Sequence, residues 1–314
     1  MLQGREEWSR PENRPKRHSR HANRIRPEVQ AFFSSNAWTF PTGTLGTLTR
    51  EAHERAAAVV GTLAELRARC AELPGALPFA AGLRGDQVRV IAEVKRASPS
   101  KGDIAPGLDA VAQAQAYERG GAAAISVLTE PSRFGGALDD LRRVSGAVRI
   151  PVIRKDFLVH PAQLWEARAA GASAALLIVR SLALDELPRL VDAAAEAGLA
   201  TLVEVRDLGE LDRALAVNAT VIGVNNRNLE TLVIDPATAP GLIPCIPASC
   251  VAVAESGMRT AADVSPVAAA GADAILVGSA ISAAADPAAE VRSLTATPRR
   301  SSPRDAAAAR ACRS

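Results

Sequence analysis

The chain has 314 residues, of which 48% are hydrophobic and 23% charged, a balance that is typical of a soluble globular protein and excludes collagen-like, coiled-coil and disordered chains. Its net charge of +3 comes from the ends, since residues 1–30 carry eight Lys or Arg against four Glu, and residues 298–314 carry five Arg against one Asp. Residues 31–297 therefore carry a net charge of −5, which argues against a nucleic-acid partner, because nucleic-acid binding needs a clustered basic face.

The two ends of the chain lack apolar periodicity. Residues 1–45 mix Arg, Pro, Asn and Ser, and residues 298–314 combine Pro and Ser with a run of Ala. We expect both to be disordered tails on either side of one catalytic domain at 46–297. Contact with RNA or a targeting role is the alternative for the first tail. No apolar run is long enough for a membrane span and no hydrophobic secretory signal is present, so we expect a cytoplasmic protein.

The central region alternates two kinds of segment. A helical segment from Thr47 to about Leu73 comes first, and it either covers the floor of the following sheet or contributes to a substrate site. Eight short apolar runs follow, separated by Ala- and Leu-rich amphipathic stretches, at 89–94, 123–129, 151–156, 174–179, 200–205, 220–225, 250–255 and 273–278. Uninterrupted apolar runs are typical of parallel strands buried on both faces. We predict an α/β fold, a single (β/α)8 TIM barrel with an extra N-terminal helical segment, with an open doubly wound sheet as the alternative.

Polar residues stand at the carboxyl ends of the predicted strands, where barrels of this kind carry their active sites. These residues are Glu93, Lys95, Lys155, Glu204, Asn225, Arg227, Glu255 and Ser256. A charge inside an apolar strand is costly unless it is paired, so structural ion pairs such as Lys155 with Glu204 are the alternative interpretation. A convergent ring of such charges instead favours an active site that works through Lys and Glu.

A second pattern points to a phosphate. Gly257, Gly278 and Ser279 follow the last two predicted strands, and the loops there commonly bind phosphate in this fold through backbone N–H groups. Ser98, in the loop after the first strand, adds a hydroxyl donor. We therefore expect a small phosphorylated molecule as the substrate.

The sequence indicates neither a metal site nor a cofactor site. None of the four histidines falls in the ring, and the four cysteines form no CxxC pair, so no metal site is indicated. There is no GxGxxG or GxxxxGK[ST] loop, so we expect no nucleotide and no other cofactor. Catalysis must then rest on the Lys and Glu side chains.

These residues lie in motifs through which the chain resembles the indole-3-glycerol-phosphate synthase family. The matching blocks follow the family order, and the most specific are EVKRASPSKG at 93–102 and NNRNLETL at 225–232, beside SVLTEPSRFGGALDDL, VIRKDF, LVEVRD, VAESG and LVGSA. The resemblance implies a carboxy-lyase of tryptophan biosynthesis. It would convert 1-(2-carboxyphenylamino)-1-deoxyribulose 5-phosphate to indole-3-glycerol phosphate with loss of carbon dioxide and water.

The resemblance also implies roles for single residues. Lys155 would be the general acid, Glu204 the general base and Lys95 the group that holds the substrate carboxylate, with Glu93 fixing Lys95 and Asn225 orienting the departing hydroxyl. The substrate would be contacted by Arg227, Glu255, Ser256, Phe134 and Phe157. Its phosphate would be contacted by Ser98, Gly257, Gly278 and Ser279. A plain core role is the alternative for the two phenylalanines.

Two departures and two other functions remain open at this point. Arg206 stands where the family often has His, and Arg180 stands where a small residue is expected. The alternatives to the synthase are another phosphosugar barrel of the tryptophan or histidine routes and a catalytically idle paralogue that binds a ligand. The sequence is compatible with a monomer.

Overall fold

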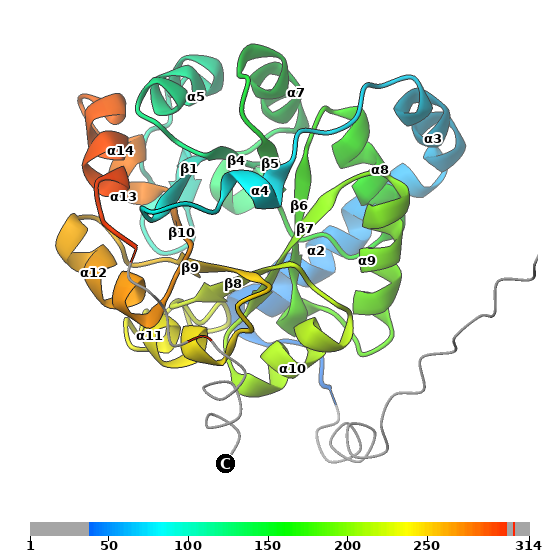
Figure 1. Ribbon diagram of the computed structural model, residues 1–314. Helices are drawn as coiled ribbons and strands as arrows, with labels where there is room; N and C mark the ends of the chain where they lie inside the picture. The colour runs from blue at the N-terminus through cyan, green and yellow to red at the C-terminus, as the bar shows by residue number, and fades with distance from the viewer. Residues whose placement is uncertain (1–37, 300–303, 305–314) are drawn as a thin grey trace, which may run out of the picture. The chain divides into compact units, whose positions relative to one another are not determined.

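The computed structural model describes residues 38–299 and residue 304. Eight parallel strands form a closed barrel in the order β1-β10-β9-β8-β7-β6-β5-β4 (Figure 1). They are β1 (Arg89–Val94), β4 (Ala124–Leu128), β5 (Val152–Lys155), β6 (Ala174–Ile178), β7 (Ala200–Val205), β8 (Val221–Asn225), β9 (Val251–Glu255) and β10 (Ala274–Val277). The predicted (β/α)8 barrel is confirmed, and the open doubly wound sheet is excluded because β1 pairs with both β4 and β10.

The strand residues fit a sheet that is covered on both faces. Every residue of β4, β6, β8, β9 and β10 is buried, as expected for strands covered by helices outside and packed side chains inside. A short hairpin of β2 (Ala97–Ser98) and β3 (Gly102–Asp103) lies in the loop after β1. The sequence patterns had not indicated this hairpin.

Each of the eight barrel strands is followed by one or more helices. They are α5 (Ala110–Arg119), α6 (Pro131–Phe134), α7 (Leu138–Ala147), α8 (Pro161–Ala169), α9 (Glu186–Glu196), α10 (Leu208–Ala216), α11 (Thr238–Leu242), α12 (Ala261–Ala270), α13 (Ser279–Ser282) and α14 (Pro287–Thr295), with 3-10 turns η1 (Val179–Ser181) and η2 (Ile243–Cys245). Several begin at side-chain caps, such as Asp109 before α5 and the capping box of Thr260 with Asp263 at α12.

Three helices precede the barrel: α2 (Gly43–Val60), α3 (Leu63–Ala71) and α4 (Phe79–Gly82). The apolar face of α2 is buried through Leu45, Leu48, Ala52 and Ala56, whose spacing puts them on one side of the helix. This helix crosses the carboxyl end of the barrel, whereas α4 lies at the amino end, just before β1 (Figure 1). The leading helical segment therefore contributes to the mouth of the barrel.

The predicted tails, 1–45 and 298–314, lie mostly outside the described residues. Two of their described parts contact the barrel. The segment before α2 bonds the β8–α11 loop, where the backbone N–H and Oγ1 of Thr42 donate to Oε1 of Glu230 at 2.6 and 3.0 Å. At the other end, Arg299 and Arg304 pair with buried Asp273.

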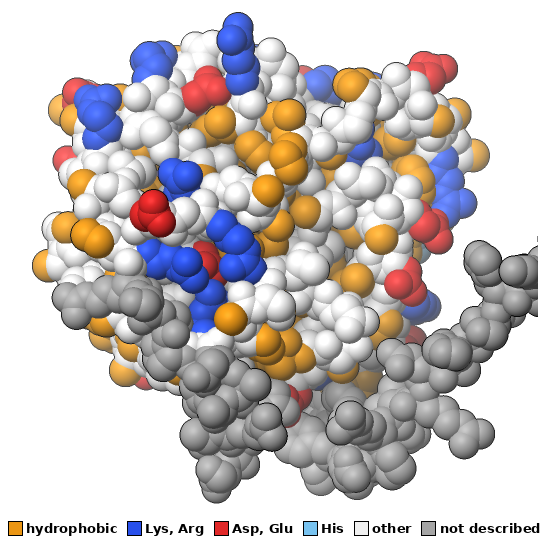
Figure 2. Space-filling model, viewed as in Figure 1, with side chains coloured by type: hydrophobic (Ala, Val, Ile, Leu, Met, Phe, Trp, Pro, Cys, Tyr) orange, Lys and Arg blue, Asp and Glu red, His pale blue; other side chains and the backbone are white. Residues whose placement is uncertain are grey.

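The surface carries charge of both signs. Figure 2 shows the face seen in Figure 1, where Lys and Arg side chains gather together with acidic ones. None of the described helices is long and apolar enough to cross a membrane.

Candidate active site

A cavity of about 500 Å³ lies at the carboxyl ends of the barrel strands. Thr44 and Leu48 of α2 form part of its wall. The predicted site residues that line it are Glu93, Lys95, Ser98, Phe134, Lys155, Phe157, Asn225, Arg227, Glu255, Ser256, Gly257, Gly278 and Ser279. Glu204 is the one predicted site residue that does not line this cavity. It lines a neighbouring cavity of about 110 Å³, which Asn225 and Arg227 also line. The structure thus brings the whole predicted set to one place.

Lys155 is the centre of the polar cluster. Its Nζ lies 3.5 Å from Oε2 of Glu204 and 3.5 Å from Oε2 of Glu255, and these three side chains come from β5, β7 and β9. Burial alone would lower the pKa of Lys155, but the negative charges of Glu255, Glu204 and Glu93 outweigh it and raise the pKa well above its ordinary value. Lys155 is therefore a fixed ammonium, charged and able to donate a proton.

Glu93 and Lys95 form a second ion pair on β1 and at its end. Nζ of Lys95 lies 3.0 Å from Oε1 of Glu93. Burial disfavours the charged form of Glu93, but Lys95 and Lys155 overcome this and hold its pKa below the ordinary value. Glu93 is thus ionised, and it fixes Lys95 at the edge of the cavity.

Glu255 differs from Glu93 in its ionisation. Burial, followed by the negative charge of Glu204, raises the pKa of Glu255 to about 8. A β-carbon at Gly223 would stand only 2.1 Å from Oε1 of Glu255, so the glycine on β8 provides the space that this carboxyl group occupies. Glu255 is the carboxyl group of the cluster that keeps a proton near neutral pH.

Asn225 orients Glu204. Its Nδ2 donates a 2.9 Å hydrogen bond to Oε1 of Glu204, and its Oδ1 accepts one of 2.9 Å from the backbone N–H of Arg227. The two bonds fix the amide and leave Oε2 of Glu204 directed at Lys155. Arg227 also donates from Nη1 to the carbonyl of Leu232, which anchors the β8–α11 loop beside the cavity.

Two aromatic rings form an apolar wall. The rings of Phe134 and Phe157 lie 6.2 Å apart at a tilt of 39°, and Nζ of Lys95 stands 5.8 Å from the centre of the Phe134 ring. A cation over an aromatic face is held by the ring quadrupole. This wall therefore combines a flat apolar surface with a positive charge at its edge.

Other residues of the cavity lining offer hydrogen-bond donors. Ser256 and Gly257 both have positive φ, of 66° and 86°, and Gly278 precedes α13. Oγ of Ser98 is buried and bonds no other described residue, so its hydroxyl is available to a bound molecule. Gly278 also has a packing role, because a β-carbon there would stand 2.4 Å from Oε1 of Glu93.

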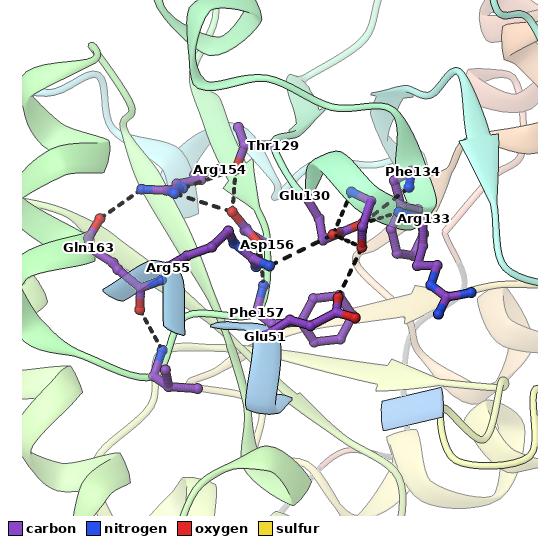
Figure 3. A network of polar contacts seen from close by, with 12 residues as sticks. Glu51, Arg55, Thr129, Glu130, Arg133, Phe134, Arg154, Asp156, Phe157 and Gln163 are labelled. Atoms are coloured by element: carbon purple, nitrogen blue, oxygen red, sulfur yellow. Dashed lines mark hydrogen bonds and ion pairs between the residues drawn. The ribbon is translucent and has the colours of Figure 1, made fainter. Parts of the chain in front are cut away.

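Sequence reasoning missed a network of charges next to the cavity (Figure 3). Asp156 lines the cavity, and its carboxylate contacts Arg55 of α2, which also approaches Glu130. Asp156 and Glu130 stand within two of the family motifs, VIRKDF and SVLTEPSRFGGALDDL, which could have pointed to them as site residues. No motif marks Arg55, whose partners are about 75 to 100 residues away in the chain.

Among the described residues, no group of three or more His, Cys, Asp and Glu is arranged to hold a metal ion. The predicted residues bring together the ammonium groups of Lys95 and Lys155, the guanidinium group of Arg227, the amide of Asn225 and the carboxyl groups of Glu93, Glu204 and Glu255. Such a set can hold an anion, donate a proton and accept one.

Comparisons with known proteins agree with this picture. The sequence model of the family described as "Indole-3-glycerol phosphate synthase" matches residues 48–294. The chain is 51% identical over 235 residues to "Indole-3-glycerol phosphate synthase 1" of Streptomyces coelicolor, covering 75% of this chain and 87% of that protein. It is 48% identical over 235 residues to "Indole-3-glycerol phosphate synthase" of Mycolicibacterium gilvum, covering 75% and 86%.

Among solved structures, the chain is similar to 3-hexulose-6-phosphate synthase from Salmonella typhimurium, with a TM-score of 0.53 and 16% identity over 66% of this chain and 97% of that one. A likeness at this level of identity shows the shared barrel fold alone.

Proposed function

The chain belongs to the indole-3-glycerol phosphate synthase family, and we propose that the cavity at the carboxyl ends of its strands carries out the family's reaction with the residues described above. The protein is a carboxy-lyase of tryptophan biosynthesis. Its phosphorylated substrate, 1-(2-carboxyphenylamino)-1-deoxyribulose 5-phosphate, closes to indole-3-glycerol phosphate with loss of carbon dioxide and water.

Ring closure is the first step that needs the protein. The aryl carbon that bears the carboxylate attacks the ketone carbon of the sugar, and the ketone oxygen gains negative charge as the new carbon–carbon bond forms. Lys155 donates a proton to that oxygen. The surrounding carboxyl groups keep this ammonium protonated until the oxygen becomes basic enough to take the proton.

Loss of carbon dioxide then restores the aromatic ring, and loss of the hydroxyl group as water completes the indole. Glu204 is the base that takes the proton released in this dehydration, since Asn225 and Lys155 fix both of its oxygens. Glu255, which holds a proton near neutral pH, stands beside the same lysine and can return that proton to the departing hydroxyl.

The two ends of the substrate are held by different parts of the cavity. Lys95 and Arg227 supply positive charge for the aryl carboxylate, and the rings of Phe134 and Phe157 pack against the aryl group. The phosphate is bound by Ser98 and by the backbone N–H groups at Gly257, Gly278 and Ser279. This arrangement stretches the substrate across Lys155.

We also propose where the protein works and which other molecules it needs. We propose a cytoplasmic monomer that needs no metal, no organic cofactor and no nucleic acid. Small phosphorylated intermediates are made and consumed in the cytoplasm, and residues 31–297 carry a net negative charge that gives nucleic acid little attraction.

One observation carries the proposal: the ammonium group of Lys155 stands 3.5 Å from two carboxyl groups inside a cavity that family motifs line. The test is the fluorescence of indole-3-glycerol phosphate formed from the carboxyphenylamino-deoxyribulose phosphate, with EDTA present. We expect product from the wild-type chain and a loss of about 10²–10⁴-fold in kcat for Lys155→Met.

The outcomes separate the alternatives. If Lys155→Met formed product at the wild-type rate, Lys155 would not be the general acid. A wild-type chain that forms no product but is stabilised against heat by the substrate is a ligand-binding paralogue.

A further inference from the structure

Beside the cavity lies a charge network that the proposed mechanism does not use (Figure 3). The side chains of Asp156 and Glu130 are 1% and 0% exposed, so both carboxylates are almost entirely buried. Arg55 of α2 is the residue that links them, with Nη2 at 2.9 Å from Oδ1 of Asp156 and Nη1 at 3.8 Å from Oε1 of Glu130. Buried charges of this kind persist only where they are fully paired.

Asp156 fixes the end of β5. Its Oδ1 accepts a 2.8 Å hydrogen bond from the backbone N–H of Phe157, and its Oδ2 accepts one of 2.6 Å from Thr129 and one of 3.2 Å from Arg154. Lys155 is the residue immediately before Asp156. The carboxylate of Asp156 therefore sets the backbone that carries both the proposed acid and one ring of the aromatic wall.

Glu130 fixes the other ring of that wall. Its carboxylate accepts hydrogen bonds from the backbone N–H groups of Ser132, Arg133 and Phe134, at 2.8, 2.8 and 3.1 Å, and so caps the short helix α6. Phe134 ends this helix and packs against Phe157 and under Lys95. Asp156 and Glu130 thus each control one ring, and Arg55 joins the two.

We propose that Arg55 is a positioning residue: by bridging Asp156 and Glu130, it sets Lys155 and the Phe134–Phe157 wall in register with one another. The inference rests on the proposed function of the cavity. Arg55 also connects α2 to the strands that carry the catalytic groups, and α2 brings Thr44 and Leu48 to the cavity. Displacements of about 1 Å in such a site lower turnover by about 100-fold.

A purely structural role for Arg55 makes a different prediction. If Arg55 only held α2 on the barrel, its loss would lower the melting temperature but leave kcat per folded molecule unchanged. The measurement is therefore kcat and KM at a temperature where circular dichroism shows each variant to be fully folded.

Three variants separate the two roles. Arg55→Met removes the charge and keeps most of the side-chain volume. Arg55→Lys keeps the charge, but a single ammonium cannot bond two carboxylates as a guanidinium fork does. Arg67→Met is the matched control, because Arg67 of α3 pairs with exposed Glu196 and stacks on Trp165, and it does not line the cavity.

We expect kcat of Arg55→Met to fall about 10- to 100-fold, with KM changing less, and kcat of Arg55→Lys to fall less than this but by more than about twofold. Arg67→Met should keep the wild-type kcat. A kcat within about twofold of wild type in folded Arg55→Met, or in Arg55→Lys if Arg55→Met does not fold, would overturn the proposal, as would an equal loss in Arg67→Met. A wild-type chain that forms no product refutes the proposed function instead.

Discussion

The five ionisable residues of the buried cluster around Lys155 balance one another in charge. Ionised Glu93 pairs with Lys95, and Lys155 lies beside both Glu204 and Glu255. Of these two carboxyl groups, that of Glu255 holds a proton near neutral pH. With that proton in place, two positive charges meet two negative ones. A buried cluster of zero net charge avoids the cost of an unpaired ion in a low-dielectric site.

The proton on Glu255 gives the enzyme a predicted pH dependence. The pKa of Glu255 in the folded chain is raised to about 8, above the ordinary value of a carboxyl group. The protonated form therefore predominates below pH 8 and is lost as the pH rises through that value. We expect kcat to fall on the alkaline side of about pH 8, because the group that returns a proton to the departing hydroxyl is then ionised.

The variant that checks this is Glu255→Gln. Its amide does not titrate, so the decline in kcat near pH 8 should disappear from its profile while its rate at pH 7 is already low. The same raised pKa stabilises the folded state below the ordinary carboxyl pKa, and this contribution is lost as the pH rises through about 8. An unchanged alkaline limb in Glu255→Gln would assign the limb to another group.

At the scale of whole elements, the strands and most helices were predictable because their signal is local. Runs of β-branched and apolar residues are sufficient to define a buried parallel strand, as at 220–225, where the structure has β8. The site could also be predicted in outline, since parallel strands place their carboxyl ends together and Lys155 and Glu204 stand at two of them.

What could not be predicted depends on contacts between distant segments. The role of Arg55 requires α2 to lie across the ends of β4 and β5, and no local pattern carries that information. Gly223 is similar. In the sequence it is a glycine inside a strand, and only the fold shows that it faces Glu255 on the neighbouring strand.

Gly223 therefore supplies a prediction at the level of paired strands. In Gly223→Ala, the new methyl group would stand 2.1 Å from Oε1 of Glu255, so β8 must push that carboxyl group away from Lys155. We expect kcat to fall about 10- to 100-fold and the free energy of unfolding to drop by about 1–3 kcal/mol.

The matched control is Gly146→Ala. Gly146 lies in α7 and a β-carbon there meets no atom within 4 Å, so this variant should keep the wild-type kcat and gain about 0.5–1 kcal/mol from better helix propensity. Kinetics and urea unfolding of both variants test the comparison. If Gly223→Ala retained full activity, the position of Glu255 would not matter for turnover.

The molecule as a whole divides its tasks between the two ends of the barrel. The carboxyl end holds the cavity, while at the amino end Asp273 joins the start of β10 to residues beyond α14. Asp273 is fully buried. Nη2 of Arg299 lies 2.7 Å from its Oδ1, and Nη2 of Arg304 lies 2.6 Å from its Oδ2. The backbone N–H of Ala252 donates a 2.8 Å hydrogen bond to the same Oδ2. These contacts fasten the C-terminal segment to β9 and β10.

Stability at this end should be separable from activity at the other. Arg304→Ala leaves Asp273 buried with one cation fewer, and we expect a loss of about 1–3 kcal/mol in the free energy of unfolding measured with urea. The control Arg142→Ala removes an exposed pair with Asp139 and should cost less than about 0.5 kcal/mol. Neither variant touches the cavity, so kcat of the folded protein should stay at the wild-type value in both. A fall in kcat for Arg304→Ala would mean that the floor and the mouth of the barrel are coupled, and the separation of stability from catalysis would then be wrong.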